Sequence, residues 1–340
     1  MKNVFLIPVL AASLVLGGCA KDQLQVNNNE EVAQMGVATA VASPPAIDPE
    51  GMLIELPGPV TGLTNVGEVL AVQVGGQLRV GTVEQVRTNA STQLPLPETC
   101  GEVTAASNTF VVACPTGEAQ ATIYLIEPTS PNLDTTRTAE IAATNAVVTS
   151  DDVVVASSDE DTVIETISPD GAKHTSVDFK ATSSALAVIT RPNQPDVVVT
   201  MNQDQTKITE VIYAKPTIGA SLRAGLGVAD MAAGEGGFLL ATDTYGEQLL
   251  VYNDFDVIRL HQQEKIVATP WAVGWDAAHQ LAWVSSLSTN QLVGYSLATG
   301  TPVQAQSHRT IADAQFLTVL PNGTLVVGSA SGAGLEVIEQ

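Results

Sequence analysis

Short apolar runs, each ending in small or hydroxyl residues, recur through most of this 340-residue chain and constrain its fold more than any other feature. We mark each run by one small or hydroxyl residue. The markers are Ala71, Ala113, Ala156, Thr200, Ala241, Ser285 and Gly328. Successive markers lie 41–44 residues apart, so seven units follow one another at a nearly constant period. Self-similarity at such a period indicates a repeat architecture.

Each unit is long enough for four strands, which is the content of one blade of a β-propeller. In the sixth unit we expect strands at 271–276, 281–286 and 292–297, with an outer strand after the turn at 298–300. The central runs are almost wholly apolar, which is typical of strands covered on both faces. The sequence therefore predicts an all-β, seven-bladed β-propeller over residues 53–340. A two-sheet sandwich or an open solenoid is the alternative.

The two ends of the repeat region complement each other. The last unit reaches only its third strand, at 334–339. A strand-like segment, LIELP at 53–57, precedes the first unit and belongs to none of the seven. We expect this segment to supply the missing outer strand and close the ring, because closure removes edges that would otherwise pair with other chains.

Two segments carry a resemblance to a known family of repeats: VVVASSDEDTVIETISPDG (153–171) and PNGTLVVGSASGAGLEVIE (321–339). Their Gly turn, apolar strand with small residues, polar loop and following strand resemble the YVTN-type propeller repeats of secreted and surface proteins. The resemblance covers residues 53–340 and implies a fold rather than a function. The chain departs from that family in lacking the regular Tyr and Asn of the second strand.

The N-terminus has the layout of an export signal. Lys2 supplies a positive start, and residues 4–16 form an apolar stretch too short for an ordinary membrane-spanning helix. Leu16-Gly17-Gly18-Cys19 follows and resembles the lipobox of bacterial lipoproteins. The resemblance implies cleavage before Cys19 and a diacylglyceryl group on its thiol, which would anchor the protein outside the cytoplasm to a cell membrane or outer membrane. An ordinary secretory signal with an incidental Cys19 is the alternative.

Residues 20–50 show no persistent period of 2 or 3.6, and they include an Asn run and two adjacent prolines. We therefore assign 1–18 to a lipoprotein signal peptide, 19–52 to the lipidated Cys and a flexible tether, and 53–340 to the propeller. A flexible chain of that length reaches about 30 Å on average.

The charge balance excludes one class of partner. The formal net charge is −22, from 14 Lys and Arg against 36 Asp and Glu. Such a surface repels phosphate backbones, which argues against nucleic-acid binding. The chain also lacks the basic cluster that would hold it to anionic lipid headgroups, so membrane attachment would depend on the lipid anchor.

Two cysteines remain after Cys19. The hairpin of the second unit is expected to turn near residues 107–108, which places Cys100 and Cys114 opposite each other. We expect a disulfide between them in an oxidising compartment. Reactive or metal-binding thiols are the alternative, although the sequence contains no Cys-x-x-Cys motif.

The mouth of the central channel is the expected place for function. The inner strands should begin near Thr61, Glu102, Asn145, Ser184, Asp230, Trp271 and Asp313, which would form a ring of mostly polar groups. Among them, Glu102, Asp230 and Asp313 are candidates for binding a cation or a polar ligand. A water-filled channel without a ligand is the alternative.

No catalytic constellation is evident. The sequence contains no Gly-x-Ser-x-Gly motif, and His174, His261, His279 and His308 fall in expected turns or outer strands without metal-ligand spacing. We therefore expect no catalytic residue, metal or cofactor, and favour a non-enzymatic interaction or accessory subunit of an envelope membrane complex.

Two other functions remain open. Some propellers that this chain resembles are metal-assisted lactonases or related esterases, and Glu102, Asp230 and Asp313 would then hold the metal. The other is a lipoprotein that binds a small ligand or a polysaccharide, a function made less favourable by an aromatic content of only 4%.

Overall fold

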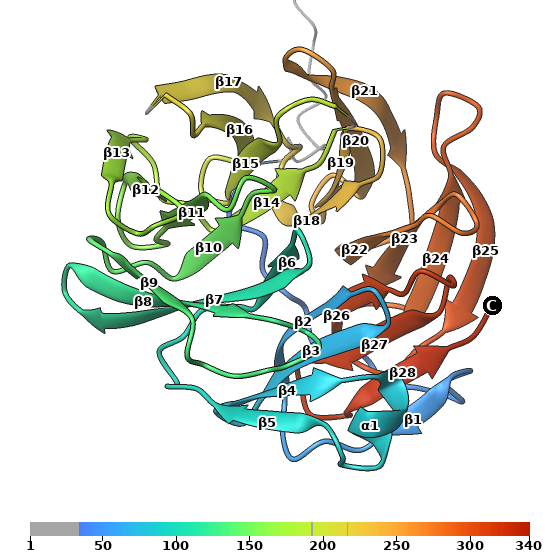
Figure 1. The fold of residues 1–340 in the computed structure, drawn as a ribbon. Helices are drawn as coiled ribbons and strands as arrows, with labels where there is room; N and C mark the ends of the chain where they lie inside the picture. Colours follow the sequence, from blue (N-terminus) through green and yellow to red (C-terminus); the bar gives the residue numbers. More distant parts are fainter. Residues whose placement is uncertain (1–33, 192, 216) are drawn as a thin grey trace, which may run out of the picture. The chain divides into compact units, whose positions relative to one another are not determined.

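The apolar runs that mark the repeat form the second strand of seven four-stranded antiparallel sheets (Figure 1). The computed structural model describes residues 34–191, 193–215 and 217–340. The expected signal peptide at 1–18 and Cys19 lie outside these residues. Within the described part of the chain, no helix is long and apolar enough to cross a membrane.

Each sheet is one blade of the propeller, with strands ordered from the channel outward. Blade 1 contains β2 (Val60–Val66), β3 (Val69–Val74), β4 (Gln77–Gly81), helix α1 (Val83–Arg87) and β5 (Thr92–Pro95). Blade 2 contains β6 (Thr104–Ala106), β7 (Thr109–Gly117), β8 (Gln120–Ile126) and β9 (Thr136–Ala139). Blade 3 contains β10 (Asn145–Val148), β11 (Val154–Ser157), β12 (Val163–Ile167) and β13 (His174–Asp178).

The remaining blades repeat this plan. Blade 4 contains β14 (Ala185–Ile189), β15 (Val197–Asn202), β16 (Lys207–Ile212) and β17 (Thr217–Arg223). Blade 5 contains β18 (Val228–Gly234), β19 (Phe238–Asp243), β20 (Gln248–Asp254) and β21 (Ile258–Lys265). Blade 6 contains β22 (Pro270–Asp276), β23 (Leu281–Ser286), β24 (Gln291–Ser296) and β25 (Val303–Arg309). Blade 7 contains β26 (Ala314–Val319), β27 (Leu325–Ser329), β28 (Leu335–Ile338) and β1 (Met52–Ile54).

The seven inner strands surround a central channel. Each inner strand contacts the inner strand of the next blade, and β26 contacts β2, so the ring is closed (Figure 1). We call the end of the channel at which the inner strands begin the near mouth, and the end at which they finish the far mouth. The predicted seven-bladed β-propeller is therefore confirmed.

Strand β1 closes the ring. It pairs antiparallel with β28, so that Met52 lies opposite Val337 and Ile54 lies opposite Leu335. The expectation that an N-terminal strand supplies the outer strand of the last blade is confirmed, although the strand spans 52–54 rather than 53–57. The fully buried Glu336 reinforces the closure, because its Oε1 accepts a hydrogen bond from the Gly51 amide at 2.8 Å.

Apolar side chains pack between neighbouring blades. One buried cluster joins Leu70 and Val72 of blade 1 to Val326 and Leu335 of blade 7. Removing each such side chain from water contributes about 1.5–3 kcal/mol, so the core stabilises the junctions between blades as well as the blades themselves. Trp283 is fully buried in a similar cluster between blades 6 and 7.

Residues 34–51, which we call the strap, lie on the propeller and correct the expectation of a flexible tether over this stretch. The hydroxyl of Tyr245 donates to the Val37 carbonyl at 2.7 Å, and the Asn290 amide donates to the Pro44 carbonyl at 2.7 Å. These bonds join the strap to loops at the near mouth rather than to a strand edge. Contacts of this kind require no period of 2 or 3.6 in the sequence. The lack of a period in residues 34–51 therefore did not indicate a flexible segment.

Candidate functional site

The central channel holds a cavity of about 540 Å³. Five of the seven predicted channel residues line it: Glu102, Asn145, Ser184, Asp230 and Trp271. They come together because each lies within two residues of the start of an inner strand, and these starts converge at the near mouth. The side chains of Gln203 and Gln315, which sequence reasoning missed, also line the cavity.

Thr61 and Asp313 do not line the described cavity. The Thr61 hydroxyl donates to the Gln73 carbonyl at 3.3 Å. Asp313 binds the strap instead, because its Oδ1 accepts a hydrogen bond from the Ser43 amide at 2.9 Å. The structure therefore does not bring Glu102, Asp230 and Asp313 together as a three-carboxylate site.

Asp230 joins two inner strands. Its Oδ1 accepts from its neighbour, the Met231 amide, at 2.7 Å, and its Oδ2 accepts from the Val273 amide of blade 6 at 2.9 Å. Burial raises the pKa of Asp230 to about 6, although these two hydrogen bonds act in the opposite direction. Both oxygens are committed to backbone donors, which leaves Asp230 less free than Glu102 to bind a ligand.

Glu102 reaches into the channel from the second blade. Desolvation by the channel walls raises the pKa of Glu102 to about 8, and the charge of Asp230 adds a smaller increase. The Glu102 side chain is nevertheless exposed to the channel, and its carboxyl can donate a hydrogen bond whenever it is protonated. Among the described residues that line the cavity, none is Lys, Arg or His. The channel thus offers carboxyl, amide and hydroxyl groups to a small polar ligand.

The far mouth has a different character. A cavity of about 920 Å³ opens there, and its lining includes Val188, Phe238, Trp275, Leu320 and Pro321. The rings of Phe238 and Trp275 meet edge to face, with centroids 4.8 Å apart and planes at 89°. The channel therefore has a polar near mouth and a largely apolar, aromatic far mouth.

Cys100 and Cys114 form a disulfide in blade 2. The hairpin between β6 and β7 turns at Ser107 and Asn108, both at positive φ, as the sequence predicted. The Gly101 amide donates to the Ala113 carbonyl at 2.9 Å, which continues the pairing toward the two cysteines. Neither cysteine lines the cavity. The disulfide joins the segment that precedes β6 to strand β7.

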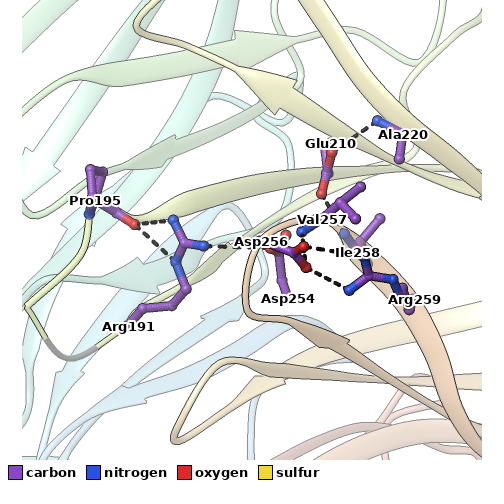
Figure 2. Close-up of polar contacts among 9 residues, drawn as sticks. All are labelled: Arg191, Pro195, Glu210, Ala220, Asp254, Asp256, Val257, Ile258 and Arg259. Atoms are coloured by element: carbon purple, nitrogen blue, oxygen red, sulfur yellow. Dashed lines mark hydrogen bonds and ion pairs between the residues drawn. The ribbon is translucent and has the colours of Figure 1, made fainter.

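A buried acidic pair between blades 4 and 5 was not foreseen (Figure 2). Glu210 on β16 accepts hydrogen bonds from the Ala220 amide at 2.9 Å and from the Ile258 amide of blade 5 at 2.6 Å. It therefore links the outer strands of two blades. The available signal was a single carboxylate in the third strand of the blade, KITEVI at 207–212.

Asp254, at the end of β20, lies beside this carboxylate and is 1% exposed. Arg191 approaches its Oδ1 at 3.5 Å, but the same guanidinium also donates to the Pro195 carbonyl at 3.1 and 2.8 Å (Figure 2). Burial, followed by the hydrogen bond and negative charge of Glu210, raises the pKa of Asp254 to about 6, while Arg191 lowers it. Asp254 Oδ2 has no hydrogen-bond donor in the described structure.

Comparison with known proteins identifies the fold alone. No protein-family model and no curated protein sequence matches the chain. Among solved structures, 1058 chains match, which indicates a widespread architecture. At identities of 11–12%, the three similar structures described next support a β-propeller and leave its activity open.

The first is a chain of the mitotic checkpoint complex, 12% identical with a TM-score of 0.64, covering 99% of this chain and 100% of that chain. The β-propeller domain of Myceliophteria thermophila Cps50 (Swd1) is 12% identical with a TM-score of 0.64, covering 89% and 98%. The structure of U3-55K is 11% identical with a TM-score of 0.67, covering 87% and 100%.

Proposed function

We propose that this chain is a bacterial lipoprotein whose YVTN-type β-propeller acts outside the cytoplasm as a non-enzymatic interaction or accessory subunit of an envelope membrane complex. The lipobox at Cys19 supports the anchoring, and the closed ring supports a rigid interaction module. One of the similar structures belongs to a multi-protein complex, which agrees with this role without testing it.

The main support for the interaction proposal is the apolar and aromatic lining of the far mouth. Its apolar lining, with Phe238 packed edge to face on Trp275, has the aromatic character of residues that dominate binding at protein interfaces. A cavity of about 920 Å³ would accept a few apolar side chains from a protein partner. We therefore assign partner binding to the far mouth.

The start of the strap indicates the face at which the chain enters the propeller. Its first contacts lie at the near mouth, where the Gly36 amide donates to the Leu226 carbonyl at 3.0 Å. Fourteen residues separate Cys19 from residue 34. The strap therefore enters the propeller at the near-mouth face, opposite the far mouth that we assign to a protein partner.

The cavity favours a second candidate, binding of a small polar ligand. Glu102 and the amides of Asn145, Gln203 and Gln315 all line the same space. Metal-assisted lactone hydrolysis receives less support. Asp313 is bonded to the strap, and both oxygens of Asp230 accept backbone hydrogen bonds.

Co-purification from detergent-solubilised membranes tests the interaction proposal. Tagged wild-type protein should retain a specific partner, and Trp275→Ala together with Phe238→Ala should lose it. Val303→Ser is a matched control, because Val303 is 49% exposed on the rim of blade 6 and lies away from both mouths. Recovery of the wild-type chain alone, or equal capture by the far-mouth variant, would refute the proposal.

Fractionation tests the anchor separately. Cys19→Ser should move the protein from the membrane fraction to the soluble extracytoplasmic fraction, and metabolic labelling with a fatty acid should mark the wild type alone. Membrane association that survives this substitution would contradict lipid anchoring at Cys19.

A further inference from the structure

Glu140, Glu165 and His174 come together at the outer edge of the junction between blades 2 and 3. One ligand atom from each side chain lies within 4.8 Å of the other two. Glu140 directly follows β9 of blade 2, whereas Glu165 and His174 lie on β12 and β13 of blade 3. We propose that these three side chains bind a divalent transition-metal ion of the Zn²⁺ type.

The register of blade 3 creates half of this site. Glu165 lies opposite Ser176, and His174 is two residues from Ser176 on the same face of β13. His174 Nδ1 consequently lies 2.5 Å from Glu165 Oε1. Glu165 is fully buried, and the His174 side chain is 20% exposed. A ring nitrogen is therefore directed at a carboxylate oxygen near the protein surface.

The preceding blade supplies the third group. The Glu140 amide donates to Glu165 Oε2 at 2.7 Å, which fixes the backbone of Glu140 beside the site. Its own carboxylate is exposed and free to turn toward the other two ligands. An ion could therefore enter from solvent and keep water at its remaining coordination positions.

Blade 7 offers a comparison within the same molecule. Glu336 is also fully buried on the third strand of its blade, and it also binds an amide just beyond the outer strand of the preceding blade, that of Ile311 at 2.9 Å. Its other oxygen accepts from the Gly51 amide at 2.8 Å. In blade 7, the Gly51 and Ile311 amides and the Thr310 hydroxyl satisfy the buried glutamate, and the apolar Ile311 takes the place of Glu140. Satisfying the buried glutamate does not require an imidazole and a second carboxylate.

The donor set favours the chemical class. One imidazole nitrogen and two carboxylate oxygens suit Zn²⁺ and similar ions, whereas Ca²⁺ prefers six to eight oxygen ligands. Zinc–ligand distances are about 2.0–2.2 Å, so neighbouring ligand atoms lie roughly 3.3 Å apart. The His174–Glu165 contact would have to open by less than about 1 Å, which a rotation of a surface imidazole can supply. The bound ion would link blade 2 to blade 3.

Calorimetric titration of Zn²⁺ into the full chain, purified without a histidine tag and stripped with a chelator, tests the site. We expect one saturable site at micromolar or tighter affinity, a zinc-dependent rise in melting temperature, and no response to Ca²⁺. His174→Ala and Glu140→Gln should each weaken binding at least about tenfold, because even changes around a metal's ligands cost about 10–100-fold.

His308→Ala is the matched control. Like His174, His308 lies on an outer strand, has a side chain that is about one fifth exposed, and contacts a glutamate: its Nδ1 lies 3.0 Å from Glu50 Oε2. The His308→Ala substitution should leave the zinc affinity unchanged. Lack of saturable binding, or wild-type affinity in either His174→Ala or Glu140→Gln, would overturn the proposal. Thermal denaturation of each variant without metal establishes that a loss of binding does not reflect unfolding.

Discussion

Ser43 and Asp313 bind each other twice: the Ser43 amide donates to Asp313 Oδ1 at 2.9 Å, and the Asp313 amide donates to Ser43 Oγ at 2.9 Å. Asp313 directly precedes the inner strand of blade 7, at positive φ. This reciprocal pair fixes the middle of the strap at the near mouth. The residue that the sequence suggested for ligand binding is thus used to hold another part of the chain.

Replacing Asp313 with Ala should release the strap while leaving the propeller folded. Loss of a partly buried hydrogen-bond acceptor costs about 1–3 kcal/mol, which is small beside the packing of the ring. Hydrogen exchange followed by mass spectrometry should show faster exchange across residues 36–46 and unchanged protection of the inner strands. Glu118→Ala, at an exposed carboxylate in another loop, serves as the control. Equal exchange in both variants would contradict the role assigned to Asp313.

Glu102 should titrate with a midpoint near pH 8. A carboxyl-carbon NMR titration of protein labelled at glutamate can measure it directly. Asp230→Asn should lower the pKa of Glu102, because removing a nearby negative charge makes ionisation easier. Glu127→Gln, at an exposed carboxylate of the same blade, should not change it. A Glu102 midpoint in the ordinary range for glutamate would contradict the desolvated channel described above.

Asp254 should make stability depend on pH. Its folded-state pKa of about 6 lies above the ordinary value of 3.8, so the folded protein binds this proton more tightly than the unfolded chain. The resulting stabilisation is fully present below about pH 4 and is lost as the pH rises through 6. The two-unit shift corresponds to at most about 3 kcal/mol.

Asp254→Asn should therefore stabilise the protein at pH 7–8 relative to wild type, with the difference shrinking toward pH 4. Urea unfolding across this range measures it. Asp256→Asn is the control, and its effect on stability should depend on pH in the opposite direction, because a hydrogen bond from Arg259 lowers the pKa of Asp256. A constant difference between Asp254→Asn and wild type across this pH range would show that Asp254 does not titrate there.

Glu336 should be needed for ring closure. It is fully buried and accepts hydrogen bonds from the Gly51 amide, the Ile311 amide and the Thr310 hydroxyl. Glu336→Ala leaves these donors without a partner and should destabilise the protein by about 3–5 kcal/mol, the range for breaking one side of a buried charged network. Urea unfolding measures the loss, with the exposed Glu339→Ala as the control. A change below 1 kcal/mol would contradict the closure role.

The Cys100–Cys114 disulfide should stabilise the protein modestly. Its loop of about 15 residues corresponds to roughly 3 kcal/mol in the chain-entropy model. Replacing both cysteines with Ser, or reducing the wild type, should lower the melting temperature by similar amounts. Reductant should not lower it further in the double variant, and such a drop would show that the effect comes from elsewhere.

Sequence reasoning located the channel because repeats leave a strong signal. Strands packed on both faces must be apolar at a fixed period, so the start of each inner strand could be estimated within two residues. Asn145 begins β10, and Ser184 directly precedes β14. The convergence of these residues at one mouth then follows from the symmetry of a closed ring.

Contacts that break the repeat could not be derived in this way. Most contacts of the strap are isolated hydrogen bonds to loops, which impose no period on residues 34–51. The approach of His174 to Glu165 depends on the register between two strands, and the position of Glu140 depends on how one blade meets the next. Neither relationship is encoded in the spacing of these residues along the chain.

The pairing of β1 with β28 has a consequence for how the protein is made. Residues 52–54 leave the ribosome long before residues 335–337, so the ring cannot close while translation is in progress. During that interval the edges of the first and last blades stay unpaired, and such edges promote aggregation and invite proteolysis. Slow synthesis would therefore lower the yield of this protein even when its finished fold is stable.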